Sequence, residues 1–309
     1  MKNKLVTLFG GGGFVGRYAV QALLAAGARV RIAQRDPRQS AFLRTQGGLG
    51  QTQFIAADVR RRDSVERAVA GADAVVNLVG TFGGDLNAIH VEGARTIASE
   101  AAAAGASALV HVSAIGADPS AASAYARTKG EGEGAVRAEF AKATILRPST
   151  VFGREDAFVN RFAGLAASMP VVPVLRGGAR FQPVFVADVA DAIVAALSDP
   201  KRYGGQIFEL GGPDVMTMAE LNRWVARAIG RRPRTVELPD LLGRLMASLP
   251  GTPITADQWT LLQSDSVVGP AAEGLAELGI VPTPLASVAP AWLVRFRRHG
   301  RFTEVGTTA

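Results

Sequence analysis

The chain has 309 residues, a formal net charge of +7 and no cysteine. This length accommodates one large α/β unit or two modest domains with a substantial core. The lack of cysteine in the sequence excludes disulfides, thiolate zinc sites and cysteine nucleophiles. The positive charge favours a negatively charged binding partner, such as a phosphorylated cofactor, an anionic protein surface or lipid headgroups. Nucleic acid is not expected, because aromatic residues form only 6% of the chain and do not interleave with the scattered arginines.

Nothing along the sequence predicts a transmembrane segment, because charge and glycine interrupt the alanine-rich helices every few residues. The first expected strand begins at about residue 4, which leaves no room for a signal peptide. We therefore expect a cytoplasmic protein or an already trimmed mature form. A peripheral position on the cytoplasmic face of an inner membrane stays open as a second location.

An apolar run meets four consecutive glycines at the start of the chain. Residues 5–9 predict a strand, and three glycines with G-x-x-G-x-x-G spacing follow it. Glycine permits a turn with positive φ, lets backbone N–H groups approach a pyrophosphate, and allows a helix to pack closely on a strand. A helical pattern over 14–26 and a second strand from residue 28 complete half of a dinucleotide-binding βαβ unit. The three glycines are Gly10, Gly13 and Gly16.

Strand and helix patterns alternate through the first half of the chain. The expected strands are continuous apolar runs, as parallel strands covered on both faces require. The segment 92–104 consists mostly of small alanines and predicts a helix packed tightly on the sheet. The alternation predicts an α/β fold with a doubly wound parallel sheet, the NAD(P)-binding Rossmann fold. The expected strands lie near residues 4–9, 28–34, 52–57, 73–79, 107–113 and 142–147.

After about residue 150, prolines divide the elements into short pieces. A strand-like run at 180–186 precedes a helix at 187–197 that we expect to return to the first domain. Thr217 and Glu220 have the spacing of a capping box, which predicts the start of another helix. Further helical stretches are expected at 238–249, 256–263 and 284–299. The expected domains are a Rossmann domain at 1–165 with 181–210 returning to it, a small discontinuous C-terminal α+β cap at 166–180 and 211–299, and a tail at 300–309.

The end of the second strand indicates the cofactor. An acid that binds the ribose 2′-hydroxyl would favour NAD there, but the strand ends in Gln34 and is followed by Arg35. An arginine can bind a 2′-phosphate in a bidentate manner, so we favour NADP(H) over NAD(H). A solvated helix start would contain the same arginine. Asp58, after the third strand, is placed to contact the adenine edge, although a turn-forming aspartate has the same pattern.

A serine, a tyrosine and a lysine form the candidate catalytic set. Ser113 ends the fifth strand, and Tyr125 and Lys129 follow four residues apart, on one helix face. A nearby ammonium lowers a tyrosine pKa from about 10 towards neutral pH, as a general acid requires. A serine hydroxyl can hold a carbonyl oxygen. Because Y-x-x-x-K also occurs by chance, the position after the right strand carries the argument.

Two histidines and two segments have more than one interpretation. His90 and His111 have no partner at metal-ligand spacing, so no metal site is expected and both are interpreted as core or helix-surface residues. The run 292–302 combines apolar anchors with four arginines. It predicts either a docked terminal helix or an interfacial helix that meets an anionic membrane or a larger complex. The short apolar helix at 238–250 predicts either the roof of a substrate pocket or a partner surface.

Together these motifs resemble extended or atypical short-chain dehydrogenase/reductases over about residues 1–220. Across the whole chain the pattern is most similar to the NAD(P)H-binding accessory subunits of respiratory complex I and their bacterial relatives. The superfamily motifs are the three glycines, Asp58-Val59, Ser113, Tyr125, Lys129, Leu146-Arg147-Pro148-Ser149, Val151-Phe152-Gly153 and the segment 183–190. The features of the narrower family are Arg35-Asp36-Pro37, Asn160-Arg161-Phe162 and the segments 263–268 and 278–283.

The resemblance implies a tightly held NADP(H), with the nicotinamide ribose on Tyr125 and Lys129. In the complex I subunit the nucleotide is regarded as structural, whereas other members reduce carbonyls, epimerise nucleotide sugars or reduce quinones. The turn at 77–83 departs from the one common in active members. The residues expected to bind the dinucleotide are Gly10, Gly13, Phe14, Val15, Gly16, Arg35, Asp58, Val59, Leu78, Val79, Gly80, Tyr125, Lys129 and Pro148.

Three functions follow from these patterns. The first is an NADP(H)-binding accessory or assembly-type subunit associated with NADH:ubiquinone oxidoreductase, reached through the resemblance and the basic tail. The second is a soluble NADP-dependent reductase or epimerase that uses Ser113, Tyr125 and Lys129. The third is a regulatory protein that senses NADP(H) without chemistry. The residues alone leave open whether the bound nucleotide reacts.

Overall fold

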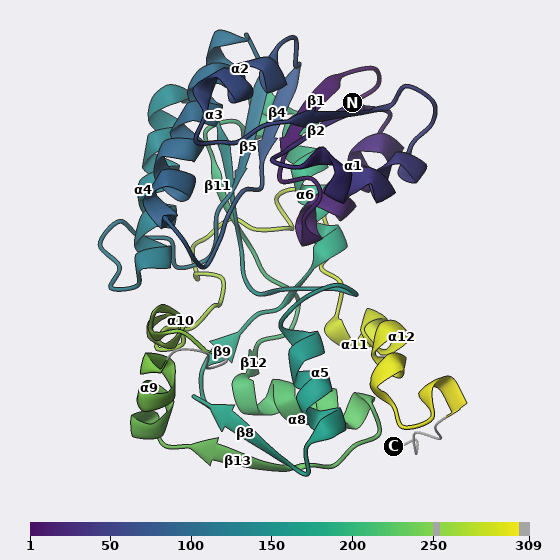
Figure 1. Ribbon diagram of the computed structural model, residues 1–309, viewed down its shortest axis with the longest axis vertical. Coiled ribbons are helices and arrows are strands. Elements are labelled where there is room, and N and C mark those ends of the chain that lie inside the picture. The colour runs from purple at the N-terminus through teal and green to yellow at the C-terminus, as the bar shows by residue number, and fades with distance from the viewer. Residues whose placement is uncertain (250–253, 303–309) are drawn as a thin grey trace. The chain divides into compact units, whose positions relative to one another are not determined.

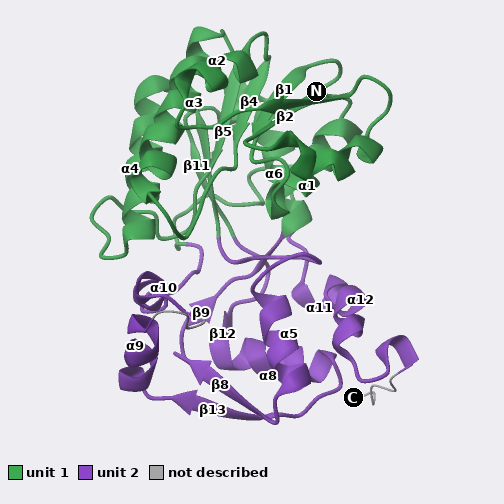
Figure 2. Ribbon diagram, in the orientation of Figure 1, with its two compact units in different colours: residues 1–148, 186–210, 269–281 green, residues 149–185, 211–268, 282–309 purple. Residues whose placement is uncertain are grey.

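The computed structural model describes residues 1–249 and 254–302 (Figure 1). The chain divides into two compact units, each assembled from three separate segments (Figure 2). Unit 1 comprises Met1–Pro148, Val186–Leu210 and Gly269–Val281. Unit 2 comprises Ser149–Phe185, Gly211–Val268 and Pro282–Ala309.

Unit 1 is built on a seven-stranded sheet in the order β11-β6-β5-β4-β1-β2-β3, with parallel pairing throughout. This arrangement confirms the expected doubly wound parallel sheet. The six strands predicted from apolar runs are joined at one edge by β11, which pairs with β6. The strands are β1 (Leu5–Phe9), β2 (Arg29–Gln34), β3 (Thr52–Ala56), β4 (Ala74–Asn77), β5 (Ala108–Val112), β6 (Thr144–Pro148) and β11 (Ile207–Leu210).

Helices cover both faces of this sheet: α1 and α6 lie on one face, and α2, α3 and α4 on the other (Figure 1). Val75, Ile97 and Leu109 are buried between the sheet and the second group. The strand side chains that face this second group are therefore largely apolar. The helices are α1 (Phe14–Ala25), α2 (Arg62–Val69), α3 (Gly93–Ala103), α4 (Ala124–Glu139), α6 (Val186–Ser198) and α7 (Pro200–Tyr203). A 3₁₀ segment, η1 (Pro37–Gln46), follows β2, and a π-helical turn, η2 (Ala88–Glu92), precedes α3.

Unit 2 combines short strand pairs with a helical core in which α5 packs against α8. Phe152, Leu221, Val225 and Leu293 are buried in that core. The paired strands are β7 (Val151–Phe152) with β10 (Val184–Phe185), β9 (Arg180–Phe181) with β12 (Met216–Thr217), and β8 (Val171–Leu175) with β13 (Arg234–Leu238). The helices are α5 (Val159–Ser168), α8 (Met218–Ala228), α9 (Asp240–Ser248), α10 (Ala256–Leu261), α11 (Leu285–Val288) and α12 (Pro290–Leu293), followed by the 3₁₀ turns η3 (Val294–Phe296) and η4 (Gly300–Phe302).

Two expectations for unit 2 had different outcomes. The capping box is confirmed: the Glu220 N–H donates to Thr217 Oγ1 over 3.2 Å, and the Thr217 N–H donates to Glu220 Oε2 over 2.8 Å. The single helix expected over 284–299 is wrong, because that segment divides into α11, α12 and η3. Pro290 begins α12 and has no N–H with which to continue the preceding helix.

The two units differ from the expected domains at three segments. Residues 149–165 and 181–185, both expected in the Rossmann domain, lie in unit 2. There β7 pairs with β10, and the rings of Phe152 and Phe185 are 5.5 Å apart. Residues 269–281 lie in unit 1, because they bind the edge strand β11. The Gly269 N–H donates to a Glu209 carboxylate oxygen over 2.8 Å, and the Glu209 N–H donates to the Glu273 carbonyl over 2.8 Å.

Candidate functional site

The glycine-rich loop joins β1 to α1 and has a shape that side chains would prevent. Gly10 has φ +83°, in the left-handed region that favours glycine. The Gly13 N–H closes the turn by donating to the Gly10 carbonyl over 3.0 Å. A Cβ on Gly16 would collide with the Gly10 carbonyl oxygen and with the Gly11 Cα. The loop and the helix therefore approach one another as closely as their backbones allow.

The N-terminus of α1 suits a bound phosphate. Gly13 is the N-cap residue, and among the described residues no side chain caps this end of the helix. The first turn also contains no acidic residue. The backbone N–H groups of a first helical turn have no partner within the helix, and the helix dipole makes that end positive. Phe14, Val15 and Gly16 occupy this turn, so this end of α1 fits the pyrophosphate of a dinucleotide.

The end of β2 leaves an arginine exposed beside the loop. The Gly12 N–H donates to Gln34 Oε1 over 3.1 Å, and Gln34 Nε2 donates to the Asp36 carbonyl over 2.6 Å. The Asp36 carboxylate pairs with Arg38 over 2.9 Å. Arg35 is exposed, and its charge helps to lower the pKa of Asp58. Gln34 thus fixes the loop, and Arg35 offers a positive charge beside it.

Asp58 follows β3 and is held by a neighbouring arginine. Arg60 Nε donates to Asp58 Oδ1 over 3.0 Å, and Arg60 Nη2 donates to Asp58 Oδ2 over 2.6 Å. These hydrogen bonds lower the pKa of the Asp58 carboxyl to about 2. Any contact between Asp58 and an adenine amino group would share the carboxylate with Arg60. Val59 lies behind it, against Gly93 at the start of α3.

The turn after β4 lies against the glycine loop. The Leu78 N–H donates to the Phe9 carbonyl over 3.0 Å, and the Leu78 carbonyl carbon lies 3.4 Å from the position of a Cβ on Gly10. The Val79 N–H donates to Asn77 Oδ1 over 3.0 Å. The structure therefore brings Leu78 next to Gly10, and Val79 and Gly80 follow it in the turn. Pro148 ends β6, which is two strands from β4 in the same sheet.

Lys129 and Ser113 are buried near the end of β5. Lys129 Nζ donates to the Val112 carbonyl over 2.8 Å, and burial lowers the pKa of Lys129 to about 8. The Ser113 N–H donates to the Leu146 carbonyl over 2.7 Å. Ser113 Oγ is buried and has no hydrogen-bond partner in the described part of the chain. A hydroxyl in this state can still donate to, or accept from, a polar group of a ligand.

Tyr125 lies on α4 under an aromatic cover. The Phe82 ring stacks on the Tyr125 ring with centroids 4.3 Å apart and planes inclined by 14°, while Phe82 itself is 57% exposed. The His90 ring meets Tyr125 edge-on at 5.4 Å. Burial raises the pKa of Tyr125 to about 12. The expectation of a lowered tyrosine pKa is wrong for this structure, because burial disfavours the phenolate and Lys129 Nζ donates to the Val112 carbonyl.

His90 links the loop that carries Phe82 to α4. The Thr81 N–H donates to His90 Nε2 over 3.0 Å, and His90 Nδ1 lies 2.9 Å from Thr128 Oγ1. Since Nε2 accepts, the ring proton is on Nδ1, which donates to Thr128. Burial lowers the pKa of His90 to about 4. The interpretation of His90 as a core residue is confirmed, and the structure adds that it holds the loop beside Tyr125.

Sequence reasoning assigned no role to Phe82 in the site and none to His90. Gly80, Gly83 and Gly84 surround Phe82 and mark a loop, so an aromatic residue there was a usable signal. No local pattern connects His90 to its partners, because Thr128 is 38 residues away in the chain.

The comparisons with known proteins place the chain in a family. The model of the NAD dependent epimerase/dehydratase family matches residues 6–211. The chain belongs to this family. Its matched region contains the glycine loop, Ser113, Tyr125 and Lys129. The predicted resemblance to short-chain dehydrogenase/reductases with NAD(P)-binding folds is thereby confirmed.

Relatives and one solved structure extend the similarity to most of the chain. The mitochondrial NADH dehydrogenase (ubiquinone) 1 alpha subcomplex subunit 9 of Arabidopsis thaliana is 34% identical over 96% of this chain and 79% of its own length. A ceramide reductase of Caulobacter vibrioides is 32% identical over 76% of this chain and 74% of its own length. An NADPH-dependent quinone oxidoreductase of Escherichia coli, complexed with NADPH, shares the fold with a TM-score of 0.77 and 19% identity, covering 93% of this chain and 99% of that one.

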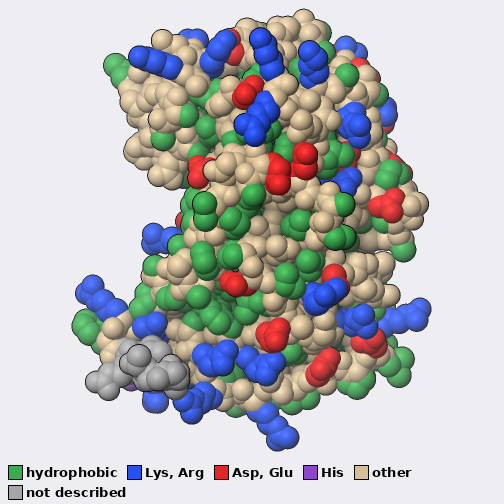
Figure 3. Space-filling view, turned by 180° about the vertical axis from the view of Figure 1, so that it is seen from behind, with side chains coloured by type: hydrophobic (Ala, Val, Ile, Leu, Met, Phe, Trp, Pro, Cys, Tyr) green, Lys and Arg blue, Asp and Glu red, His purple; other side chains and the backbone are tan. Residues whose placement is uncertain are grey.

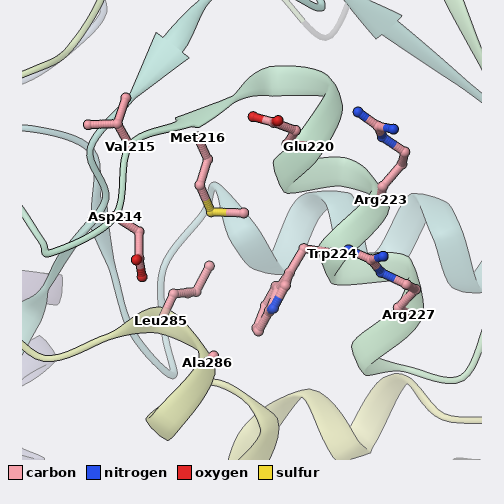
Figure 4. A pocket seen from close by; sticks show the side chains of 9 residues that line it. All are labelled: Asp214, Val215, Met216, Glu220, Arg223, Trp224, Arg227, Leu285 and Ala286. Carbon is pink, nitrogen blue, oxygen red and sulfur yellow. The ribbon is translucent and has the colours of Figure 1, made fainter. Parts of the chain in front are cut away.

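Other features of this family member lie outside the glycine and tyrosine sites. Within 1–249 and 254–302, no helix is long and apolar enough to cross a membrane, and no three acidic or histidine side chains cluster as metal ligands. Unit 2 has a hollow of about 530 Å³, with Met216 and Trp224 on its apolar side and Arg223 and Arg227 on the same helix as Trp224 (Figure 4).

The basic run 292–302 packs on unit 2 by its apolar side chains. Trp292 and Phe296 contact the unit 2 core, as expected, but the run divides among α12, η3 and η4 and does not form one terminal helix. Two of its arginines donate to backbone carbonyls of the same unit. Arg295 donates to the Arg154 carbonyl over 3.1 Å, and Arg297 donates to the Ala228 carbonyl over 3.2 Å. Residues 303–309 of the expected tail lie outside the described residues.

Proposed function

We propose that this chain is an NADP(H)-binding accessory or assembly-type subunit associated with NADH:ubiquinone oxidoreductase. The similarity to the Arabidopsis NADH dehydrogenase subunit supports the assignment, because it covers both units and 79% of that protein. The bound nucleotide has a structural role in this proposal. Gly10, Gly13 and the first turn of α1 hold the pyrophosphate, and Lys129 holds the nicotinamide ribose.

One observation carries the choice of a structural role. The phenol ring of Tyr125 lies under Phe82, and burial raises its pKa to about 12. A general acid works best when its pKa is near the working pH, and Phe82 covers one face of the partly buried phenol ring. The side chains at this site therefore favour holding the nucleotide over reacting it.

The test follows the protein in native membranes. We expect an epitope-tagged chain to co-migrate with NADH:quinone oxidoreductase on native gels, and we expect deletion of the gene to lower the amount of assembled complex. Complementation with the Tyr125→Phe variant should restore assembly as well as the wild type does, because phenylalanine keeps the stack on Phe82 and removes the proton donor. The proposal is overturned if the protein migrates apart from the complex and deletion leaves assembly unchanged.

We also propose that NADP(H) is preferred over NAD(H). Arg35 is exposed at the end of β2, and the one acid that follows it closely, Asp36, is paired with Arg38. We expect the Arg35→Gln variant to bind NADPH about tenfold more weakly, since a charge-assisted contact to the 2′-phosphate is lost. NADH serves as the internal control, because it lacks that phosphate. If fluorescence titrations showed an equal loss of affinity for NADPH and NADH, Arg35 would contribute only its positive charge and would not recognise the 2′-phosphate.

A reductase is the second candidate, and Ser113 favours it. Its hydroxyl is buried with no hydrogen-bond partner among the residues described, so it can orient a carbonyl oxygen. Tyr125 would donate a proton to that oxygen, and Lys129 would hold the ribose of a nucleotide that supplies hydride to the carbonyl carbon. The similarity to a ceramide reductase over 76% of this chain supports this candidate. Phe82 would have to leave the Tyr125 ring before a substrate could approach.

Turnover separates the two candidates. Purified protein is incubated with NADPH and either a soluble quinone or an oxidised ceramide, and NADPH consumption is followed by absorbance. For a reductase we expect consumption that Tyr125→Phe lowers by a factor of about 100 or more, as loss of a general acid does. Equal rates for the variant and the wild type would eliminate Tyr125 as the proton donor.

A further inference from the structure

Helix α9 of unit 2 exposes its large apolar residues: its small residues face the protein and its leucines face outward. A Cβ on Gly243 would collide with the Trp259 indole ring, and Ala247 is buried in the same cluster. At 3.6 residues per turn, the leucines fall in one stripe opposite Gly243 and Ala247. Leu241 is 78% exposed. The exposed leucines are Leu241, Leu242, Leu245 and Leu249.

The exposed apolar side chains of the described residues concentrate around this helix. Seven of the thirteen large ones lie in the two segments 169–175 and 234–249. Strands β8 and β13 pair in parallel, so Val171 lies beside Arg234 and Pro173 beside Val236 on one face. Soluble proteins normally expose large apolar residues singly and scattered over the surface. The exposed leucines and valines here are instead grouped on one part of unit 2.

Exposed arginines lie on α9 and on the strand that leads into it. Arg244 is on α9, Arg234 begins β13, and Arg232 lies two residues before it. The two acids of the segment contact its own unit: Asp240 pairs with Arg176 over 2.7 Å, and Glu237 accepts from the Gly177 N–H over 2.9 Å. The segment 231–249 contains four arginines against these two acids. Figure 3, a view from behind, shows Lys and Arg side chains along the lower edge of the picture, with a few Asp and Glu side chains above them.

The start of β13 adds a basic hollow to this surface. A cavity of about 340 Å³ lies where α5 ends, and its lining includes Met169, Arg231 and Arg232. Guanidinium groups bind phosphate oxygens in a bidentate manner. The hollow could therefore bind an anionic headgroup near the exposed apolar residues of β8 and β13.

We propose that the outward leucine face of α9 docks on the surface of an anionic lipid bilayer, with the neighbouring arginines on the headgroup phosphates. An interfacial helix has an apolar stripe that enters the headgroup and acyl boundary and basic residues at its border, and α9 with Arg234 and Arg244 has this composition. The lipid surface explains the excess of arginine, which an apolar protein interface would have to leave unpaired. The proposal does not depend on nucleotide binding or on association with a respiratory complex.

The experiment is co-sedimentation of the purified full-length chain with vesicles. The vesicles contain either phosphatidylcholine alone or a mixture of phosphatidylcholine and phosphatidylglycerol. We expect binding to the mixed vesicles that falls as salt is added. The Leu241→Ser/Leu245→Ser double variant should bind them about tenfold more weakly. Leu49→Ser is the matched control, since Leu49 is an exposed leucine of unit 1 and should leave binding unchanged.

The charges are tested separately. We expect the Arg234→Gln/Arg244→Gln double variant to lose the preference for phosphatidylglycerol, with its circular dichroism and melting temperature as checks of folding. The proposal is overturned if the wild type binds neither kind of vesicle, or if the Leu241→Ser/Leu245→Ser variant binds the mixed vesicles as tightly as the wild type does. It is also overturned if the wild type forms dimers that the leucine substitutions dissociate while vesicle binding is absent, because a second copy would then be the occupant.

Discussion

The glycine loop and the tyrosine cluster (Phe82, His90, Tyr125 and Lys129) differ in the groups that they present to a ligand. The loop presents backbone atoms: Gly10 and Gly16 have no side chains, and the first turn of α1 exposes its N–H groups. The tyrosine cluster offers side chains, and these already contact one another. Phe82 stacks on Tyr125, and Lys129 donates to Val112.

This difference teaches that holding a nucleotide and reacting it make separate demands on one fold. A phosphate site needs a backbone of fixed shape, which α1 provides before any ligand arrives. A proton donor needs access and a pKa near neutrality, whereas Phe82 stacks on the Tyr125 ring and burial raises the pKa of Tyr125 to about 12. The three predictions below act on the two sites separately, in order of decreasing expected effect.

The largest effect is expected for Gly16→Ala. Its Cβ would collide with backbone atoms of Gly10 and Gly11, which cannot move aside as a flexible side chain would. We expect the variant to lose nucleotide affinity by a factor of about 100 or more and to lose about 3 kcal/mol of unfolding free energy. Isothermal titration with NADPH and urea denaturation measure the two effects.

Gly134→Ala is the matched control. Gly134 lies inside α4, and an added Cβ there meets nothing within 4 Å. Alanine is the better helix former, so we expect a gain of about 0.5 to 1 kcal/mol and unchanged affinity. If both variants behaved alike, the close approach at Gly16 would have no special role in binding.

Removal of the cover from Tyr125 should have an intermediate effect. In the Phe82→Ala variant water reaches the phenol, and we expect its pKa to fall from about 12 by about one to two units. The absorbance of tyrosinate against pH measures this shift, after subtraction of the same titration in a protein that also carries Tyr125→Phe. Phe302→Ala, an exposed phenylalanine in η4, should leave the titration unchanged. An unaltered Tyr125 pKa in Phe82→Ala would show that Phe82 does not exclude water from the phenol.

The smallest effect is expected from His90. Its pKa is about 4 in the folded chain and about 6.5 when unfolded, so the unfolded state binds more protons between these values. Stability from this group is therefore complete above pH 6.5 and is lost as the pH falls towards 4. We expect the wild type to lose about 1 kcal/mol more than His90→Gln between pH 7 and pH 5.5.

Urea denaturation at several pH values measures this difference. His111 is buried and its pKa is lowered in the same direction, but it is present in both proteins and cancels in the comparison. Parallel stability curves for the two proteins would mean that His90 titrates normally in the folded state.

Most of the parallel sheet was predictable from sequence because its signals are local. Six apolar runs, the glycine spacing and the helix over 14–26 each depend on residues that are close in the chain. The capping box at Thr217 is of the same kind. The edge strand β11 and the assignment of 149–165 to unit 2 were not predictable, because pairing partners such as Phe185 are distant in sequence. The division of 284–299 did have a local signal, since Pro290 lies inside the expected helix.

The sequence by itself determined that a close glycine turn joins β1 to α1, since glycine removes the Cβ and no neighbour can restore it. It also determined which tyrosine and lysine share a helix face, because helical geometry sets that spacing. Only the tertiary structure decided the state of that tyrosine. Phe82 and His90 reach Tyr125 from 43 and 35 residues away, and the solvent that they exclude sets its pKa. Local geometry follows from composition, whereas burial depends on residues that only folding brings together.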